Sequence, residues 1–327
     1  MDATANEYAT SPTSSSTTLD PIAIAARGSE IKGLDIYQKT TDDFDTPRVE
    51  ELMSQMYADQ PSGGTDMTYG KTDTQRLRFW NANSTTASKS SKAPVIVFVH
   101  GGSWRSGTYI DSIGSTKVGH LTEKGYAFAS VNYTLIPTVT VEEQVQEIAD
   151  SISYLVAHAA RLAIDPERVI LMGHSSGAHV VTLLGTDTSY LQRAGTSISI
   201  VKAVIGLDGS NYNAAAEIID NPGQIAEHMI SAFGTDLDRL RAVSPTYHAR
   251  APNARAFLLL HTHRHGDIRQ AVELVAALEA AGTNAVVHVF EGQGFEGHIQ
   301  ILLRLGDPRY PATVVMDHWL EMNVPVN

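Results

Sequence analysis

The sequence predicts an α/β protein in which a mostly parallel sheet carries helices on both faces. Short apolar runs such as "PVIVFV" and "VILM" recur without polar alternation, which is typical of strands buried on both faces. Segments with helical periodicity lie between these runs. Because strands and helices alternate from about residue 66 onward, we expect parallel strands connected by crossover helices.

The composition limits what the protein can bind. The 327 residues include 36 acidic and 24 basic side chains, a formal net charge of −12, and no Lys/Arg cluster. We therefore expect neither nucleic acid nor an anionic membrane surface as a partner. The chain contains no cysteine, which excludes a thiol nucleophile, disulfides and cysteine metal ligands.

The N-terminus has neither the basic start nor the apolar core of a secretory signal. No apolar run approaches the roughly 20 residues that a membrane-spanning helix needs. From these two features we expect a soluble, cytoplasmic protein. The oligomeric state stays open, with a homodimer as one possibility.

The chain divides into an N-terminal extension, residues 1–65, and a main domain, residues 66–327. The Ser/Thr-rich tract at 10–18 has too few apolar residues to order itself, so we expect it to be flexible. Apolar residues at helical spacing follow Pro47, which is a favoured first residue of a helix. This helix either packs on the main domain or forms a lid over a site.

The main domain begins with a short antiparallel pair, "DMTYG" and "QRLRFW", followed by a polar linker at 81–93. Helices are expected at 139–162, from about 176, and at 268–281, and a polar, partly helical insertion at 211–243 is a candidate cap. The remaining strands are expected at "PVIVFV", "YAFASV", "VILM", "KAVIGL", "AFLLL" and "NAVVHVF".

The stretch "MGHSSGAH" places Ser175 between Gly173 and Gly177, each two residues away. A buried strand precedes this stretch and a helical pattern follows it. A sharp strand-to-helix turn crowds the positions two before and two after its centre, and glycine satisfies that restriction. We therefore expect Ser175 to be an exposed nucleophile in strained backbone geometry, with the Ser176 amide beside it at the helix N-terminus.

A second glycine turn, "HGGSW" at residues 100–104, ends the strand "PVIVFV". Hydrolysis of an ester or amide passes through a tetrahedral oxyanion, which needs hydrogen-bond donors aimed at it in advance. Taken alone, the two glycines indicate only a chain turn. Together with the serine turn they predict an oxyanion hole made by the amides of Gly102, Ser103 and Ser176.

The segments "HGGSW", "SVNYTLIP" and "IDPERVILMGHSSGAH", in this order, resemble the α/β-hydrolase superfamily. More narrowly, the chain is similar to the HGGxW carboxylesterases and kynurenine formamidases, relatives of the hormone-sensitive-lipase-like esterases. The resemblance covers roughly residue 66 to the C-terminus. It implies the α/β-hydrolase fold with a small cap insertion, and a catalytic triad built on serine.

A serine hydroxyl becomes a good nucleophile when an imidazole takes its proton and a carboxylate fixes the tautomer of that imidazole. His298 follows the last predicted strand, where the resemblance places the base. His174 and His179 flank the serine in sequence, and His318 lies in a predicted terminal helix. For these three histidines we expect structural roles.

The resemblance places the acid beyond the strand "ARAFLLLHT", where the ungapped match is His263. Asp267 is the only carboxylate in this loop, so we predict it as the third catalytic residue and infer a local deletion. Asp208, at the end of "KAVIGLD", is the alternative, because some relatives supply the acid from the preceding strand. Glu296 is a third candidate.

His261, His263 and His265 alternate within the same loop. The segment "HTHRHGD" lacks the further ligands, at set offsets, that metallohydrolases require. We therefore expect polar loop residues here, no metal site and no cofactor.

These residues predict a carboxylesterase that cleaves esters of small or medium acyl groups through an acyl-enzyme. One alternative is an arylformamidase, which hydrolyses an amide of the N-formylkynurenine type. The other is a catalytically inactive homologue that binds a ligand, since fold alone does not assign function.

Overall fold

The computed structural model describes residues 47–83 and 92–326, which belong to one compact unit. The tract at 10–18 and most of the linker at 81–93 lie outside the described residues, so the predictions made for them stay predictions. The proposed boundary at residue 66 coincides with no change of unit, because the first helix and the first strand belong to the same one.

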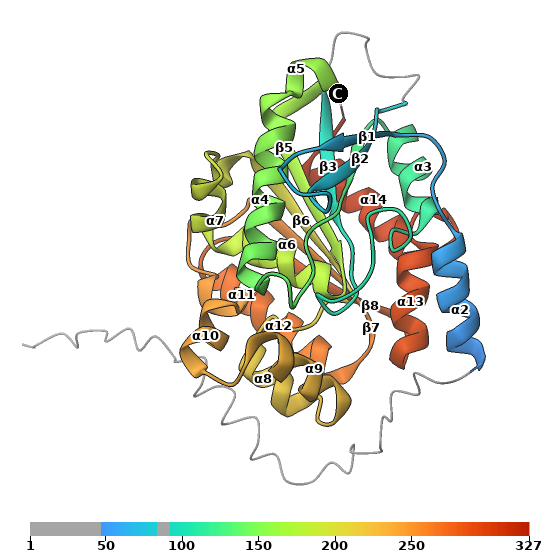
Figure 1. Ribbon diagram of the computed structural model, residues 1–327. Coiled ribbons are helices and arrows are strands. Elements are labelled where there is room, and N and C mark those ends of the chain that lie inside the picture. Colours follow the sequence, from blue (N-terminus) through green and yellow to red (C-terminus); the bar gives the residue numbers. More distant parts are fainter. Residues whose placement is uncertain (1–46, 84–91, 327) are drawn as a thin grey trace, which may run out of the picture. The chain divides into compact units, whose positions relative to one another are not determined.

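A single sheet forms the centre of the described part of the chain (Figure 1). Its strands are β1 (Thr65–Thr68), β2 (Arg76–Trp80), β3 (Ala93–Val99), β4 (Ala127–Val131), β5 (Ile164–His174), β6 (Val201–Leu207), β7 (Ala256–His263) and β8 (Asn284–Gln293). Their order in the sheet is β1-β2-β4-β3-β5-β6-β7-β8. β2 pairs antiparallel with β1 and β4, whereas the strands from β4 to β8 pair in parallel. The predicted antiparallel start and parallel remainder are confirmed.

Alternate residues of the central strands face two separate cores. In β3, Val95, Val97 and Val99 pack in one apolar cluster, while Ile96 and Phe98 pack in the other. β5 divides its apolar residues between the clusters in the same way. A strand covered on both faces needs apolar residues at consecutive positions, which explains the uninterrupted apolar runs in the sequence.

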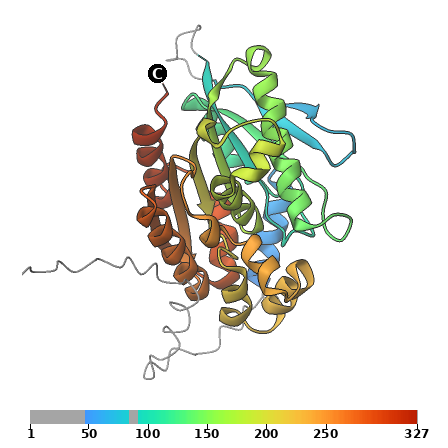
Figure 2. The same ribbon diagram turned by 90° about the vertical axis from the view of Figure 1, so that its left-hand side faces the viewer.

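Helices cover both faces of the sheet (Figures 1 and 2). They are α2 (Pro47–Ala58), α3 (Ser115–Glu123), α4 (Val141–Ala157), α5 (Ala159–Leu162), α6 (Ser176–Thr186), α7 (Thr188–Arg193), α8 (Ala214–Asp220), α9 (Gln224–Phe233), α10 (Leu237–Ala242), α11 (Pro245–His248), α12 (His265–Ala280), α13 (Gly294–Arg304) and α14 (Pro311–Asn323). α4, α6, α7 and α12 contribute to the first cluster, and α2, α3, α13 and α14 to the second. Within the described ranges, no helix combines the length and the apolar character needed to cross a membrane.

Several elements differ from their predicted bounds. The helix expected at 139–162 ends at Ala157, because His158 leaves helical geometry, and α5 follows as a separate short turn. β8 continues to Gln293, and α13 begins at the next residue. His298 therefore lies within a helix instead of in a loop before one.

The insertion expected at 211–243 contains α8, α9 and α10, which lie between β6 and β7 in the chain. Arg239 of α10 forms two hydrogen bonds with the Glu142 carboxylate of α4, at 2.8 and 2.9 Å. Phe233 of α9 packs edge-on against Trp104, with 4.7 Å between the ring centroids. These contacts fix the inserted helices against the rest of the domain.

The helix predicted after Pro47 is confirmed as α2, which lies beside α13 (Figure 1). Its buried face contains Val49, Leu52 and Met56. Asp59, just after the helix, accepts a hydrogen bond of 2.9 Å from the backbone amide of Ser115, the first residue of α3. α2 therefore packs on the domain, as the first of the two sequence interpretations expects.

Gly177 permits the close approach of α6 to β3. A Cβ at this position would lie 2.1 Å from the carbonyl oxygen of Val99. Because that oxygen belongs to the backbone of a central strand, it cannot rotate away as a side chain could. We predict that Gly177→Ala lowers the free energy of unfolding by about 2 kcal/mol or more.

Gly119 of α3 supplies a matched control, because a Cβ there meets no described atom within 4 Å. Gly119→Ala should leave the free energy of unfolding unchanged or raise it by about 0.5–1 kcal/mol, since alanine favours the helix. Chemical denaturation of both variants measures the difference. Equal stabilities would contradict the backbone contact at Gly177.

Candidate active site

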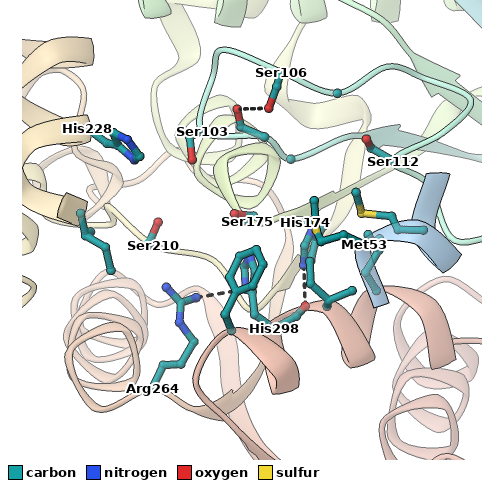
Figure 3. Close-up of a pocket in the computed structure, with 18 of the residues that line it drawn as sticks. Met53, Ser103, Ser106, Ser112, His174, Ser175, Ser210, His228, Arg264 and His298 are labelled. Atoms are coloured by element: carbon teal, nitrogen blue, oxygen red, sulfur yellow. Dashed lines mark hydrogen bonds between the residues drawn. The ribbon is translucent and has the colours of Figure 1, made fainter. Parts of the chain in front are cut away.

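Ser175 lies at the turn between β5 and α6. Its φ of 56° and ψ of −124° place it in a sparsely populated region, a conformation that recurs at functional sites. The turn is crowded as predicted, because a Cβ at Gly173 would lie 2.2 Å from the carbonyl oxygen of Gly177. Ser175 is partly exposed and lines a cavity (Figure 3).

His298 lines the same cavity from the first turns of α13. Its Nδ1 donates to Oδ2 of Asp208 over 2.6 Å, which leaves Nε2 as the nitrogen that can accept a proton. The ring of His174 lies against that of His298, tilted by 34° with 4.4 Å between the centroids, and Nε2 of His174 donates to the His298 carbonyl over 2.9 Å. Among the hydrogen bonds that join described residues, none links Ser175 to His298; in hydrolases this bond often tightens only when substrate is present.

Asp208 directly follows β6 and is fully buried, with a φ of 45°. Its Oδ1 accepts hydrogen bonds from the backbone amide and the hydroxyl of Thr262, at 2.8 and 3.1 Å. Burial alone would raise the pKa of Asp208, but the Arg264 guanidinium and the hydrogen bond from His298 lower that pKa well below its usual range. The carboxylate therefore stays ionised and can stabilise an imidazolium.

The prediction that Asp267 orients His298 is wrong in this geometry. Because the loop after β7 is short, α12 already begins at His265 and carries Asp267 in its first turn. There Oδ2 of Asp267 lies 2.9 Å from Nη2 of Arg264, while Asp208 is the carboxylate bonded to the imidazole. The sequence alternative, Asp208, therefore occupies the position of the acid.

Glu296, the third candidate for the acid, is exposed and pairs with Arg48 at 3.4 Å. His179 is buried, and its Nε2 donates to a backbone carbonyl over 2.7 Å, in agreement with the structural role predicted for it. His318 is exposed on α14, so the packing role expected for it is wrong.

The alternating histidines after β7 have unlike environments. His261 is fully buried, and its Nδ1 lies 3.6 Å from Oδ1 of Asp208. Burial lowers the pKa of His261 to about 4, so the ring is neutral near pH 7. His263 ends β7 and is exposed. In the described part of the chain, no group of three or more possible ligands is arranged to hold a metal ion.

The amides predicted for the oxyanion hole lie near Ser175. Gly102 and Ser103 line the cavity and have φ values of 121° and 51°. The following amide, that of Trp104, donates to Oγ of Ser176 over 3.3 Å. Within the described residues, no recorded hydrogen bond uses the amide of Gly102, Ser103 or Ser176. The oxyanion hole made of these three amides stays a prediction.

The cavity has a volume of about 220 Å³ and two unlike sides, with Ser175 between them (Figure 3). Helices α2 and α13 supply its apolar side, which contains Met53, Met56, Phe295, Ile299 and Leu302. The opposite side carries the polar groups of Ser210, His228 and Arg264. Ile225 and Met229, on α9 with His228, also line the cavity. The periodicity after Pro47 predicts an apolar helix, but it contains no sign that the methionines of this helix reach the site.

Arg264 is a site residue that the motifs do not predict. Its Nη1 lies 3.0 Å from Oδ2 of Asp208 and 3.1 Å from Nδ1 of His298. It is the only permanently positive side chain in "HTHRHGD". A fixed charge inside the loop expected to carry the acid is the signal that could have identified it.

Comparisons with known proteins find several that are similar to this chain. A probable isoprenylcysteine alpha-carbonyl methylesterase of Arabidopsis thaliana, ICMEL2, is 28% identical over 70% of this chain and 56% of its own length. The kynurenine formamidase of Drosophila melanogaster is 30% identical over 28% of this chain and 29% of its own. The chain spans about half the length of the first curated relatives it matches.

The esterase 2 of Thermogutta terrifontis, in its apo form, superposes with a TM-score of 0.63 at 20% identity, covering 83% of this chain and 98% of that one. This likeness and the sheet order show that the fold is the α/β-hydrolase fold, as predicted. The family model described as BD-FAE matches residues 84–278, more than half of the sequence, and the chain therefore belongs to the BD-FAE family.

Proposed function

We propose that this protein is a serine carboxylesterase that cleaves esters of small or medium acyl groups through an acyl-enzyme. One observation carries the proposal: Ser175 and His298 line one cavity, and the buried carboxylate of Asp208 accepts a hydrogen bond from His298. These three residues follow three different strands, and within the described residues no hydrogen bond uses the amides of Gly102, Ser103 and Ser176. The similarity to a methylesterase supports an ester as the substrate. Because these relatives are longer than this chain, the substrate has to be identified by experiment.

The proposed reaction uses each of these groups in turn. Nε2 of His298 takes the proton of Ser175 while Oγ bonds to the ester carbonyl carbon, and the oxyanion accepts hydrogen bonds from the free amides. The bond to the alcohol oxygen then breaks, and His298 returns the proton to that oxygen. A water molecule, deprotonated by His298, then attacks the acyl carbon. The bond between that carbon and Oγ breaks, His298 returns the proton to Oγ, and the carboxylic acid is released. Asp208 stabilises the imidazolium in both halves of the reaction.

The apolar side of the cavity supports an acyl group larger than formyl. A formyl group needs almost no acyl pocket, whereas α2 and α13 place five apolar side chains beside Ser175. We therefore propose that the acyl chain lies against Met53 and Met56. On this basis an ester is favoured over the formamide substrate of the arylformamidase alternative.

We predict that Ser175→Ala lowers kcat for p-nitrophenyl acetate about 10⁴-fold or more, because the nucleophile is lost. The thermal unfolding midpoint should not change, and a fluorophosphonate probe should label the wild-type protein but not the variant. Failure of the wild-type protein to react with the probe would support the ligand-binding alternative. Faster turnover of N-formylkynurenine than of p-nitrophenyl butyrate would support the arylformamidase.

Asp208→Asn should lower kcat about 10⁴-fold, because an amide cannot fix the required imidazole tautomer. Asp267→Asn should cost less than tenfold in the same assay, since Asp267 pairs with Arg264 and Asp208 is the carboxylate bonded to the imidazole. Glu296→Gln, on an exposed side chain, is the control and should have wild-type kcat. A larger loss for Asp267→Asn than for Asp208→Asn would contradict the assignment of the acid.

Met53→Trp should shorten the acyl pocket, because the indole fills space between α2 and α13. We expect the kcat/KM ratio of p-nitrophenyl hexanoate to p-nitrophenyl acetate to fall about tenfold. Met322→Trp is the matched control, since this methionine is exposed on α14 and does not line the cavity. An unchanged ratio in Met53→Trp would place the acyl chain elsewhere.

A further inference from the structure

Arg264 connects two buried carboxylates beside the proposed base. Its Nη1 donates to Oδ2 of Asp208 over 3.0 Å and to the Asp208 carbonyl over 3.3 Å. Its Nη2 lies 2.9 Å from Oδ2 of Asp267. The Arg264 side chain is 15% exposed, and the Asp208 and Asp267 side chains are 0% and 1% exposed. In this low-dielectric position, the guanidinium can fix both carboxylates at once because of its planar fork of donors.

The contact between Arg264 and Asp208 has two opposite effects on the imidazole. It restrains Oδ2, the same oxygen that accepts from Nδ1 of His298 over 2.6 Å, and so it fixes the direction of that bond. It also places a positive charge 3.1 Å from Nδ1, which disfavours the imidazolium. A carboxylate on the far side of the guanidinium offsets this second effect, and Asp267 occupies that position.

We infer that Arg264 is a positioning residue that fixes the Asp208 carboxylate toward His298, and that Asp267 is present to balance the charge of Arg264. The inference rests on the proposed function, because it assigns His298 as the base. It gives Asp267 a role in the site that differs from the role of triad acid.

Other charged or titratable groups also surround His298. The ring of His174 contacts that of His298, and burial, followed by the neighbouring His298, lowers the pKa of His174 well below its usual range. Burial lowers the pKa of His261 to about 4 and raises the pKa of Glu217, which accepts from Gln270. Further groups on neighbouring elements include His228 on α9, Glu296 on α13, Arg48 on α2 and Lys117 on α3. Tyr212 interacts electrostatically with Asp208, Asp267 and Arg264. Near neutral pH, His174 and His261 are therefore neutral, and Arg264 and Asp267 carry the charges that a test can alter selectively.

The test compares two substitutions that change the local charge in opposite directions. In Arg264→Gln, the loss of the cation favours the imidazolium, so the acid limb of the kcat/KM profile should move to higher pH by about half a unit or more. In Asp267→Asn, the guanidinium loses its counter-charge and the limb should move to lower pH. The double variant removes both charges, and its limb should return close to the wild-type position.

Two further measurements separate positioning from a structural role. The plateau kcat of Arg264→Gln should fall about tenfold, and Arg264→Lys should restore the limb but only part of kcat, because an ammonium lacks the fork that joins two carboxylates. Thermal unfolding of every variant reports on folding. If Arg264→Gln does not fold, the other two variants still test the inference. It requires a lower kcat in Arg264→Lys and an acid limb at lower pH in Asp267→Asn.

Fluorophosphonate labelling rates measured against pH give a readout that does not depend on the chosen ester. A wild-type protein without esterase activity and without labelling would reject the proposed function. An active wild-type protein whose two single variants leave the acid limb unmoved, or move it in the same direction, would overturn the inference about Arg264 and Asp267. Opposite shifts that cancel in the double variant would support it.

Discussion

The arrangement of the site depends on one steric constraint, the contact of the first turn of α6 with the ends of β3 and β5. Gly177 lies so close to the Val99 carbonyl, and Gly173 to the Gly177 carbonyl, that neither position accommodates a side chain. This packing over-determines the backbone between the two glycines and can therefore maintain Ser175 at a φ of 56°, which an unrestrained serine would avoid. The same constraint places the Ser176 amide at the N-terminus of α6, where the helix dipole favours negative charge.

The pairing of the parallel strands is then sufficient to bring the other groups of the site close to the serine. β5, β6, β7 and β8 are consecutive neighbours in the sheet, and their carboxyl ends carry Ser175, Asp208, Arg264 and the helix with His298. The amide of Asp208 donates to the Leu260 carbonyl of β7 over 2.7 Å, and its carboxylate accepts from Thr262 of the same strand. Because the acid is anchored to β7 at both ends, its position relative to β8 and His298 is fixed by strand pairing.

The sequence patterns predict the parts of this site that depend on strand and helix formation. They fail where the conformation of a loop determines the position of a residue. Ser175, its two glycines and the oxyanion loop follow from a buried strand, a turn and a helix. The identity of the proposed acid depends on whether α12 begins before or after Asp267. This is a difference of a few residues in a segment with no apolar periodicity. Local pattern cannot determine that register, so the carboxylate in the expected loop is chosen over Asp208. The sequence also does not predict that Met53 and Met56 line the cavity, because periodicity identifies the buried face of a helix but not the surface it contacts.

Charge balance explains why a cation can lie so close to the proposed base. Burying a charge is tolerated only when partners compensate it, and Arg264 has two carboxylates at 3.0 and 2.9 Å. Glu217 is also buried, but it accepts hydrogen bonds from the neutral donors Gln270 and Asn221. Asp208, Arg264 and Asp267 together therefore carry one net negative charge. That charge is neutralised when His298 takes the proton of Ser175, so the groups behind the imidazole stabilise the charge that develops during the reaction. Without Asp267, the net charge of Asp208 and Arg264 would be zero before the reaction, and the imidazolium would be less stabilised.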